Sequence, residues 1–162
     1  MRNILFVCTA NRCRSPMAEY FFRKQLEEHG EKSGLWSVSS AGTWTETGIP
    51  PDDKLIEVMK EFDIDIQDHR SKKLEDIDIY KQNLILVMEH NQREALQFEF
   101  PRKKNQIYLL SQMIGNDFNI DDPCGRHINE YRRVAHLINQ ILSQGHLNIL
   151  NLSMKNESTS SY

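Results

Sequence analysis

The sequence predicts an α/β fold, a single doubly wound domain in which helices flank a four-stranded parallel sheet on both faces. Short apolar runs alternate along the chain with segments whose apolar residues recur at helical spacing. The apolar runs are continuous, which is typical of parallel strands buried on both faces. The length of 162 residues suits one compact domain.

The first predicted strand covers residues 3–7 (NILFV), and a helix follows it after a tight loop. Pro16 lies near the start of this helix and Gly30 lies just past its end, the positions at which these residue types are favoured. The apolar face of the helix consists of Met17, Ala18, Phe21, Phe22 and Leu26.

The same strand–helix pattern then repeats. Further strands are predicted at residues 36–40, 84–88 and 106–110. Further helices are predicted to start after residues 50–53 (PPDD) and to cover about 91–98 and about 129–142. Parallel sheets of this kind have right-handed crossovers and bind ligands beyond the carboxyl ends of their strands.

The predicted domain covers residues 1–150. The polar, serine-rich residues 151–162 are predicted to form a flexible tail. The net charge of −3 gives no basic field for nucleic acid, and there is no apolar run long enough for membrane insertion. The N-terminus lacks the pattern of a cleaved signal, so a cytoplasmic location is expected.

The chain has three cysteines, Cys8, Cys13 and Cys124, and an odd number argues against a disulfide framework. No pair of Cys-x-x-Cys clusters occurs and the six histidines are scattered, so neither a metal site nor another cofactor is predicted.

One segment, residues 8–15 (CTANRCRS), carries the candidate chemistry. It links a buried strand to a helix, so its amides and the helix N-terminus are expected to bind an anion and to stabilise the thiolate of Cys8. Arg14 can donate two N–H groups to phosphate oxygens, and Ser15 can donate to the Cys8 sulfur. Asn11 tolerates the left-handed backbone of a tight loop. The remaining loop residues, expected to line or support the phosphate site, are Thr9, Ala10, Arg12 and Cys13.

Displacement at phosphorus also needs an acid for the leaving oxygen, and Asp122 in the segment DDPCG is the candidate. The alternative is that Asp121 and Asp122 only begin a turn, because Asp-Pro is common in turns. Spacing alone leaves both interpretations open.

Several segments together resemble the low-molecular-weight protein tyrosine phosphatases, from about residue 3 to about residue 142. The matching segments are FVCTANRCRSPMAE, SAGT, DHRSKKL, LILVMEHN and DPCG. The resemblance implies that Cys8 is a nucleophile that forms a cysteinyl phosphate and that Arg14 binds the phosphate. Asp122 would be the general acid and then the base.

The resemblance also implies supporting roles and partners. Asn11, Ser15, Ser40 and His69 match a hydrogen-bond network that shapes the loop, with His69 structural. Cys13 matches a cysteine that can form a reversible disulfide with the nucleophile, so redox regulation is implied. The implied substrate is a phosphotyrosine-containing protein, and a tyrosine kinase is a partner suggested by analogy.

Two positions depart from the family pattern. Arg12 stands where related enzymes often carry a small or apolar residue or threonine, at a position associated with the choice between phosphotyrosine and phosphoarginine. Cys124 stands where many members carry an aromatic residue. Trp44 is therefore the candidate aromatic wall of the pocket, with a partly buried loop anchor as the alternative.

Three other functions are alternatives to a tyrosine phosphatase. A protein arginine phosphatase would use the same loop. A thiol-coupled arsenate reductase needs further cysteines in the middle of the chain, but residues 60–110 contain none. A non-catalytic phospho-ligand binding module would be expected to lose the nucleophile or the acid, and both Cys8 and Asp122 are present.

Overall fold

The computed structural model describes residues 1–32 and 34–155. Within this part of the chain, four parallel strands form one sheet in the order β2-β1-β3-β4. The predicted four-stranded parallel sheet is therefore confirmed. The strands are β1 (Arg2–Cys8), β2 (Trp36–Gly42), β3 (Leu84–Val87) and β4 (Ile107–Leu109).

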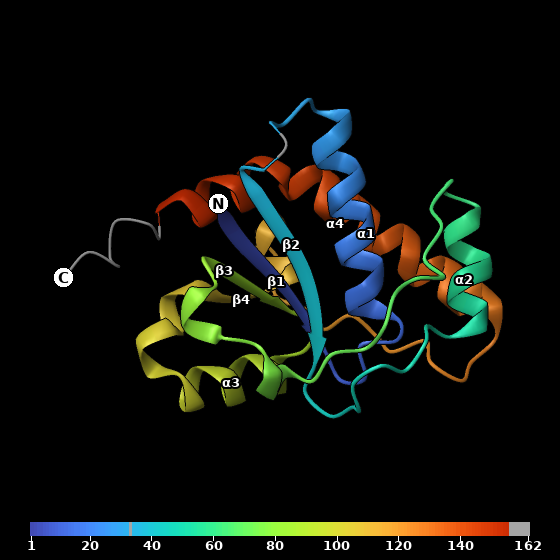
Figure 1. Cartoon of the computed structure of the whole chain (residues 1–162), viewed down its shortest axis with the longest axis horizontal. Coiled ribbons are helices and arrows are strands. Elements are labelled where there is room, and N and C mark those ends of the chain that lie inside the picture. The colour runs from blue at the N-terminus through green and yellow to red at the C-terminus, as the bar shows by residue number, and fades with distance from the viewer. Residues whose placement is uncertain (33, 156–162) are drawn as a thin grey trace.

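Helices cover both faces of the sheet, as Figure 1 shows. Helices α1 and α4 pack on one face with α2 against α4, and α3 packs against β3 and β4 on the other. This arrangement confirms the predicted doubly wound fold. The α-helices are α1 (Arg14–Glu28), α2 (Asp53–Lys60), α3 (His90–Glu99) and α4 (Ile128–Lys155). Short 3-10 helices occur at η1 (Leu74–Asp76), η2 (Ile79–Lys81), η3 (Pro101–Gln106) and η4 (Leu110–Ile114).

The central strand β1 explains why the first apolar run is continuous. Ile4 and Phe6 belong to the core beneath α1 and α4, whereas Leu5 and Val7 belong to the core beneath α3. Successive side chains of a strand point to opposite faces, so a strand covered on both faces needs apolar residues at every position.

The last helix is longer than the sequence analysis predicted. Helix α4 continues past residue 142 to Lys155, so the first part of the predicted tail is helical. Ile149, Leu150 and Ser153 are buried, because the helix keeps an inward face along this length. The rest of the predicted tail, residues 156–162, lies outside the described residues. Across residues 1–32 and 34–155, no helix combines the length and apolar character needed to cross a membrane.

The carboxyl ends of the strands place the candidate site. Strand β1 ends at Cys8 and its neighbour β2 ends at Gly42. The backbone N–H of Thr43 donates to the carbonyl oxygen of Cys8 at 2.9 Å, and that of Trp44 donates to Thr9 at 2.9 Å. The segment after β2 is thereby fixed beside the loop that follows β1.

Candidate active site

The sulfur of Cys8 is buried and lies between two hydrogen-bond partners. The Ser15 hydroxyl oxygen is 2.9 Å from Cys8 Sγ, and the backbone N–H of Asn11 donates to the same sulfur at 3.3 Å. The Ser15 oxygen also accepts from Asn11 Nδ2 at 2.9 Å, and its own proton can be donated to the sulfur or, at 3.4 Å, to the carbonyl oxygen of Ala41. Two hydrogen-bond contacts thus converge on this sulfur and fix its position in the loop.

Asn11 organises the loop. Its backbone has a φ of 54°, in the left-handed region that Asn tolerates better than most residues. Its side-chain amide donates to Ser15 and, at 2.8 Å, to Ser40, and its Oδ1 accepts from the backbone N–H of Lys72 at 2.9 Å. Its carbonyl oxygen lies 2.9 Å from His69 Nε2. One buried residue thus joins three segments that are distant in the sequence.

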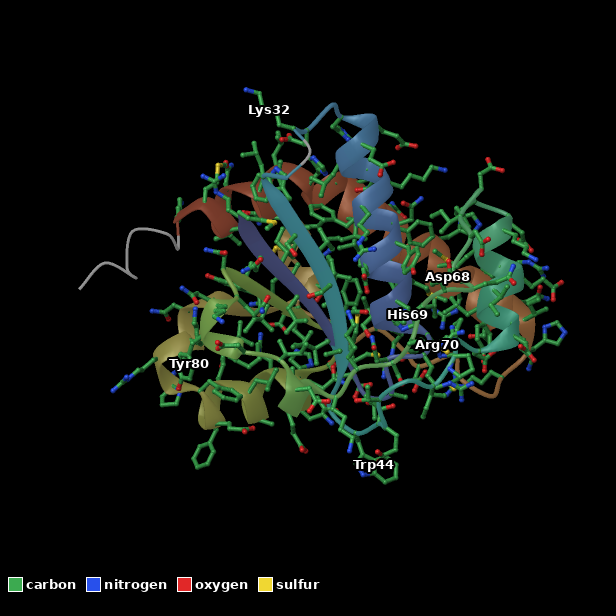
Figure 2. The ribbon with its side chains drawn as sticks, viewed as in Figure 1. Lys32, Trp44, Asp68, His69, Arg70 and Tyr80 are labelled. Carbon is green, nitrogen blue, oxygen red and sulfur yellow. The ribbon has the colours of Figure 1, made fainter. Side chains whose placement is uncertain are left out.

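His69 supports this loop from the interior, and Figure 2 shows it among the side chains near the start of α1. Burial lowers the pKa of His69, so the ring is neutral near pH 7. The carbonyl oxygen of Asn11 can only accept, so Nε2 carries the proton and donates it. This geometry suits the structural role that the resemblance implied for His69.

The phosphate-binding candidate Arg14 is almost completely buried, with 2% of its side chain exposed. Its Nη1 donates to the Glu89 carboxylate and, at 2.8 Å, to the carbonyl oxygen of Ile120. Burial alone would lower the pKa of Arg14, but the negative charges on Cys8, Glu89 and Asp122 outweigh it and raise the pKa. Arg14 therefore stays positively charged at the base of the site.

The structure separates the two candidate acids. Asp122 Oδ2 lies 3.5 Å from Arg14 Nη2, and its side chain is 43% exposed. Asp122 Oδ1 accepts the backbone N–H of Cys124 at 3.0 Å, a short-range contact typical of turns. Asp121 instead lies 3.4 Å from Arg133 Nη2 on α4. Only Asp122 is brought to the loop, although it also stabilises the turn.

Three residues of the site were missed in the sequence analysis. Glu89 anchors Arg14, and its place directly after the buried strand β3 was a signal that could have identified it. Glu19 is a buried carboxylate on α1 that accepts from the Ser40 hydroxyl and pairs with Arg23 at 2.6 Å. An acidic residue within an apolar helical pattern was its signal.

The third missed residue, Gln92, links the loop to α3. Its Oε1 accepts the backbone N–H groups of Met88 and Glu89, both at 3.1 Å. Its Nε2 donates to the Thr9 hydroxyl at 3.2 Å. No motif marked this residue, because its partners lie on two different strand ends.

The two candidate specificity residues stand at the edge of the site. Arg12 Nε donates to the carbonyl oxygen of Pro50 at 3.0 Å, so its guanidinium extends toward the segment before α2. Trp44 is 84% exposed and projects from the lower edge of the molecule in Figure 2. An indole this exposed is not a partly buried loop anchor, so the alternative for Trp44 does not hold.

The other two cysteines meet beside the loop. Cys13 is buried and Cys124 is exposed. Their sulfur atoms and a carboxylate oxygen of Asp52 all lie within 4.8 Å of one another. The sequence spacing did not indicate that these three potential metal ligands would be neighbours.

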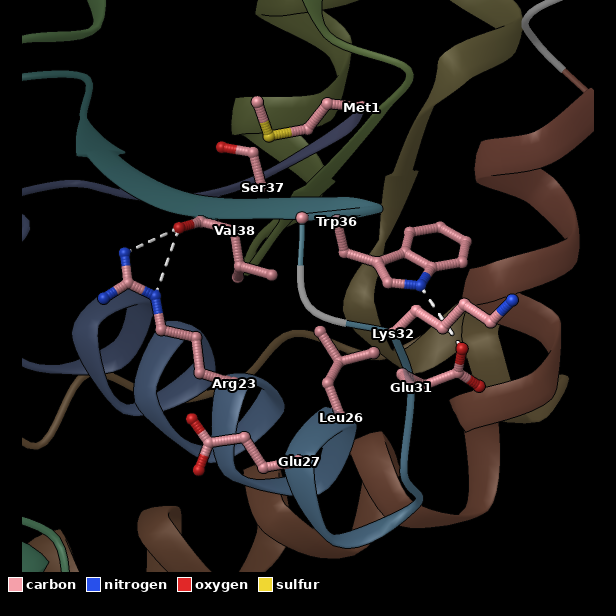
Figure 3. Close-up of a pocket in the computed structure, with 10 residues that line it drawn as sticks. Met1, Arg23, Leu26, Glu27, Glu31, Lys32, Trp36, Ser37 and Val38 are labelled. Carbon is pink, nitrogen blue, oxygen red and sulfur yellow. Dashed lines mark hydrogen bonds between the residues drawn. The ribbon is translucent and has the colours of Figure 1, made fainter.

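A separate hollow lies at the amino edge of the sheet, between the end of α1 and the start of β2 (Figure 3). Arg23 Nε and Nη2 donate to the carbonyl oxygen of Val38 at 3.3 and 2.8 Å, and Trp36 Nε1 donates to Glu31 Oε2 at 3.4 Å. The described residues that line it include no cysteine or histidine. The candidate nucleophile is at the other edge of the sheet.

Known proteins with a similar sequence include two with different activities in their names. The chain is 34% identical to a probable low molecular weight protein-tyrosine-phosphatase, EpsP, of Ralstonia nicotianae over 138 residues, 85% of this chain and 89% of the relative. It is also 34% identical to arsenate reductase 2 of Staphylococcus saprophyticus over 143 residues, 88% of this chain and 95% of the relative.

Solved structures are similar over most of the chain. A low molecular weight protein tyrosine phosphatase from T. tengcongensis has a TM-score of 0.82 and 32% identity, over 89% of this chain and 97% of that one. The YwlE arginine phosphatase from Geobacillus stearothermophilus has a TM-score of 0.81 and 29% identity, over 96% of this chain and 97% of that one.

The family described as low molecular weight phosphotyrosine protein phosphatase matches residues 3–156, nearly the whole chain. This match includes both the loop at residues 8–15 and the Asp122 segment. The chain therefore belongs to the low molecular weight phosphotyrosine protein phosphatase family.

Proposed function

We propose that this member of a phosphatase family hydrolyses phosphotyrosine in proteins through a cysteinyl-phosphate intermediate on Cys8. One observation carries the proposal: Arg14 and Asp122 meet 3.5 Å apart over the loop in which two donors hold the Cys8 sulfur. A nucleophile, a phosphate binder and an acid thus converge on one spot.

The geometry suggests how Arg14 binds phosphate. Its Nη1 is held by Glu89 and Ile120, so the guanidinium plane has a defined orientation. The opposite edge of the guanidinium can then donate from Nε and Nη2 to two phosphate oxygens. The backbone N–H groups of residues 8–15 and the start of α1 supply the other donors.

The reaction proceeds in two displacements. Cys8 Sγ attacks phosphorus, the bond from phosphorus to the tyrosine oxygen breaks, and protonated Asp122 gives its proton to that oxygen. Asp122 then takes a proton from water, and the water oxygen attacks the cysteinyl phosphate. The S–P bond breaks, inorganic phosphate leaves, and Ser15 stabilises the Cys8 thiolate.

The test of this proposal is a rapid-mixing assay with p-nitrophenyl phosphate. A covalent intermediate predicts a burst of p-nitrophenol of about one equivalent per site whenever its hydrolysis is the slow step. Cys8→Ser should show no burst. A protein that binds phosphate without releasing p-nitrophenol would instead be a binding module.

Arsenate reduction is the rival enzyme activity, because several relatives from Staphylococcus carry that name. Reduction of arsenate requires two electrons from thiols, whereas ester hydrolysis requires none. An assay with arsenate and a dithiol reductant, run beside the phosphatase assay, separates the two activities. The lack of cysteines in residues 60–110 favours hydrolysis.

Substrate choice gives a testable prediction about Arg12. Its guanidinium adds positive charge at the rim, which should repel the guanidinium of phosphoarginine and attract acidic residues flanking phosphotyrosine. Wild type is expected to prefer phosphotyrosine, and Arg12→Ile and Arg12→Thr should shift the ratio of kcat/KM toward phosphoarginine. Peptides carrying each phospho-residue measure this ratio, and the preference for acidic flanks should weaken as salt is added.

Trp44 gives a second prediction about substrate choice. Its exposed ring can pack against a phenyl ring, a contact worth about 0.5–1.5 kcal/mol. Trp44→Ala should therefore raise the activation free energy for phosphotyrosine by about that amount, lowering its kcat/KM, and should affect phosphoarginine less. An unchanged ratio in both Arg12 variants, or a wild type that prefers phosphoarginine, rejects Arg12 as the selector.

On family likeness, we further infer a cytoplasmic site of action and a tyrosine kinase as a substrate.

Gly42 gives a prediction about the loop itself. A Cβ at this position would lie 2.6 Å from the Thr9 carbonyl oxygen and 3.0 Å from the Ala10 carbonyl carbon, both backbone atoms. Gly42→Ala is therefore expected to displace the loop, lowering phosphatase activity and reducing the free energy of unfolding by about 1–3 kcal/mol. Urea denaturation and kcat measure the two effects, with Ser37→Ala at the far end of β2 as the control. Full activity in Gly42→Ala would show that the loop tolerates this displacement.

A further inference from the structure

The contact between Cys13 and Cys124 brings two distant segments together. Cys13 is the residue that precedes the first turn of α1, but its side chain makes no capping hydrogen bond with the helix. Its sulfur atom, the sulfur atom of Cys124 and a carboxylate oxygen of Asp52 all lie within 4.8 Å of one another. Cys124 belongs to the acid loop, which we define as residues 121–125.

The two thiols have unequal environments, which suits stepwise oxidation. Cys124 is exposed to solvent, whereas Cys13 is 4% exposed. The hydrogen bond between them lowers the pKa of Cys124 to about 7 and, together with burial, raises the pKa of Cys13. Cys124 is thus the thiolate that an oxidant meets first, and Cys13 is the thiol beside it.

The acid loop couples this pair to the candidate acid. The backbone N–H of Cys124 donates to Asp122 Oδ1 at 3.0 Å, and Asp122 Oδ2 faces Arg14 at 3.5 Å. The next residue, Gly125, donates its N–H to the Tyr131 hydroxyl at 3.1 Å. A bond that draws Cys124 toward Cys13 therefore also restrains Asp122.

We propose that Cys13 and Cys124 form a regulatory disulfide that restrains the acid loop and slows turnover without consuming Cys8. Restraining the loop slows turnover because Asp122 must first give a proton to the leaving oxygen and later take a proton from water. The effect on turnover rests on the proposed phosphatase function, whereas the disulfide itself does not. This pairing differs from the Cys8–Cys13 disulfide implied by the family resemblance.

The oxidant is a peroxide. The Cys124 thiolate attacks one peroxide oxygen, the O–O bond breaks, hydroxide leaves, and Cys124 becomes a sulfenic acid. Cys13 then attacks the Cys124 sulfur, the S–O bond breaks, and the hydroxyl group leaves as water with the proton from Cys13. The two thiols lose two electrons and the peroxide gains them. A small dithiol can reverse the reaction, because Cys124 is exposed.

Peptide mapping tests the pairing directly. Trypsin cleaves after Arg2, Arg12, Arg14, Lys104 and Arg126, so the three cysteines fall in separate peptides, residues 3–12, 13–14 and 105–126. After mild hydrogen peroxide and alkylation of the full chain, we expect 13–14 linked to 105–126. The buffers contain EDTA, because two thiolates and a carboxylate could also bind zinc.

The variant Cys8→Ser makes this test sharp. The linked peptide is expected in Cys8→Ser as in wild type. It should be lost in Cys124→Ser, a substitution at an exposed position that leaves the core intact. A link between 3–12 and 13–14 in wild type, with no link in Cys8→Ser, overturns the proposal. The same mapping applies even if the protein proves to have no phosphatase activity.

Turnover tests the restraint separately. In wild type, hydrolysis of p-nitrophenyl phosphate should fall in step with formation of the linked peptide. Dithiothreitol should then remove the linked peptide and restore turnover. Complete conversion to the linked peptide with unchanged kcat overturns the restraint. Absent turnover in the reduced protein counts against the proposed function and leaves the mapping result to decide the disulfide.

Discussion

Replacing Cys8 with serine is expected to abolish turnover of p-nitrophenyl phosphate while preserving phosphate and vanadate binding. The hydroxyl of serine is a far weaker nucleophile than a thiolate held by Ser15 and Asn11. The loop amides and Arg14, which we propose bind the anion, remain in place. Steady-state kinetics and calorimetric titration with phosphate measure the two properties on the same preparation.

Arg14→Lys is the companion variant for the phosphate side of the site. It keeps the positive charge but loses the planar pair of donors and the anchoring contacts to Glu89 and Ile120. We expect both phosphate affinity and kcat to fall sharply. Near-native kcat in either Cys8→Ser or Arg14→Lys contradicts the proposed mechanism.

The second large effect is expected at Asp122. Asp122→Asn removes the proposed proton donor, so kcat for substrates with poor leaving groups should fall by about 10²–10⁴-fold. Substrates whose leaving groups need no proton should be affected much less. A series of aryl phosphates with different leaving-group pKa values measures this dependence.

Asp121→Asn is the matched control for Asp122→Asn. Both changes remove one negative charge from adjacent positions, but Asp121 pairs with Arg133 on α4 and not with Arg14. We expect Asp121→Asn to change kcat little at any leaving group. If the larger loss is found for Asp121→Asn, the acid has been assigned to the wrong carboxylate.

The sequence by itself predicted the sheet, the helix order and the loop at residues 8–15, because these depend on short-range patterns. A strand buried on both faces needs a continuous apolar run, and Pro16 and Gly30 mark the limits of the first helix. Cys8, Arg14 and Ser15 lie within one such local unit. Their convergence needs no information from elsewhere in the chain.

Only the tertiary structure decided which distant residues complete the site. Asp121 and Asp122 are equivalent in local sequence, and they differ because one faces Arg133 and the other faces Arg14. Glu89 meets Arg14 because the ends of β1 and β3 lie at the same edge of a parallel sheet.

The contact of Cys13 with Cys124 depends on the same long-range packing. Likewise, α4 continues to Lys155 because Ile149 and Leu150 are buried against the folded domain. The local sequence near residue 142 did not indicate this longer helix. Local periodicity specifies the elements, but the partners of a buried charge or thiol are set only when strand ends and loops come together in space.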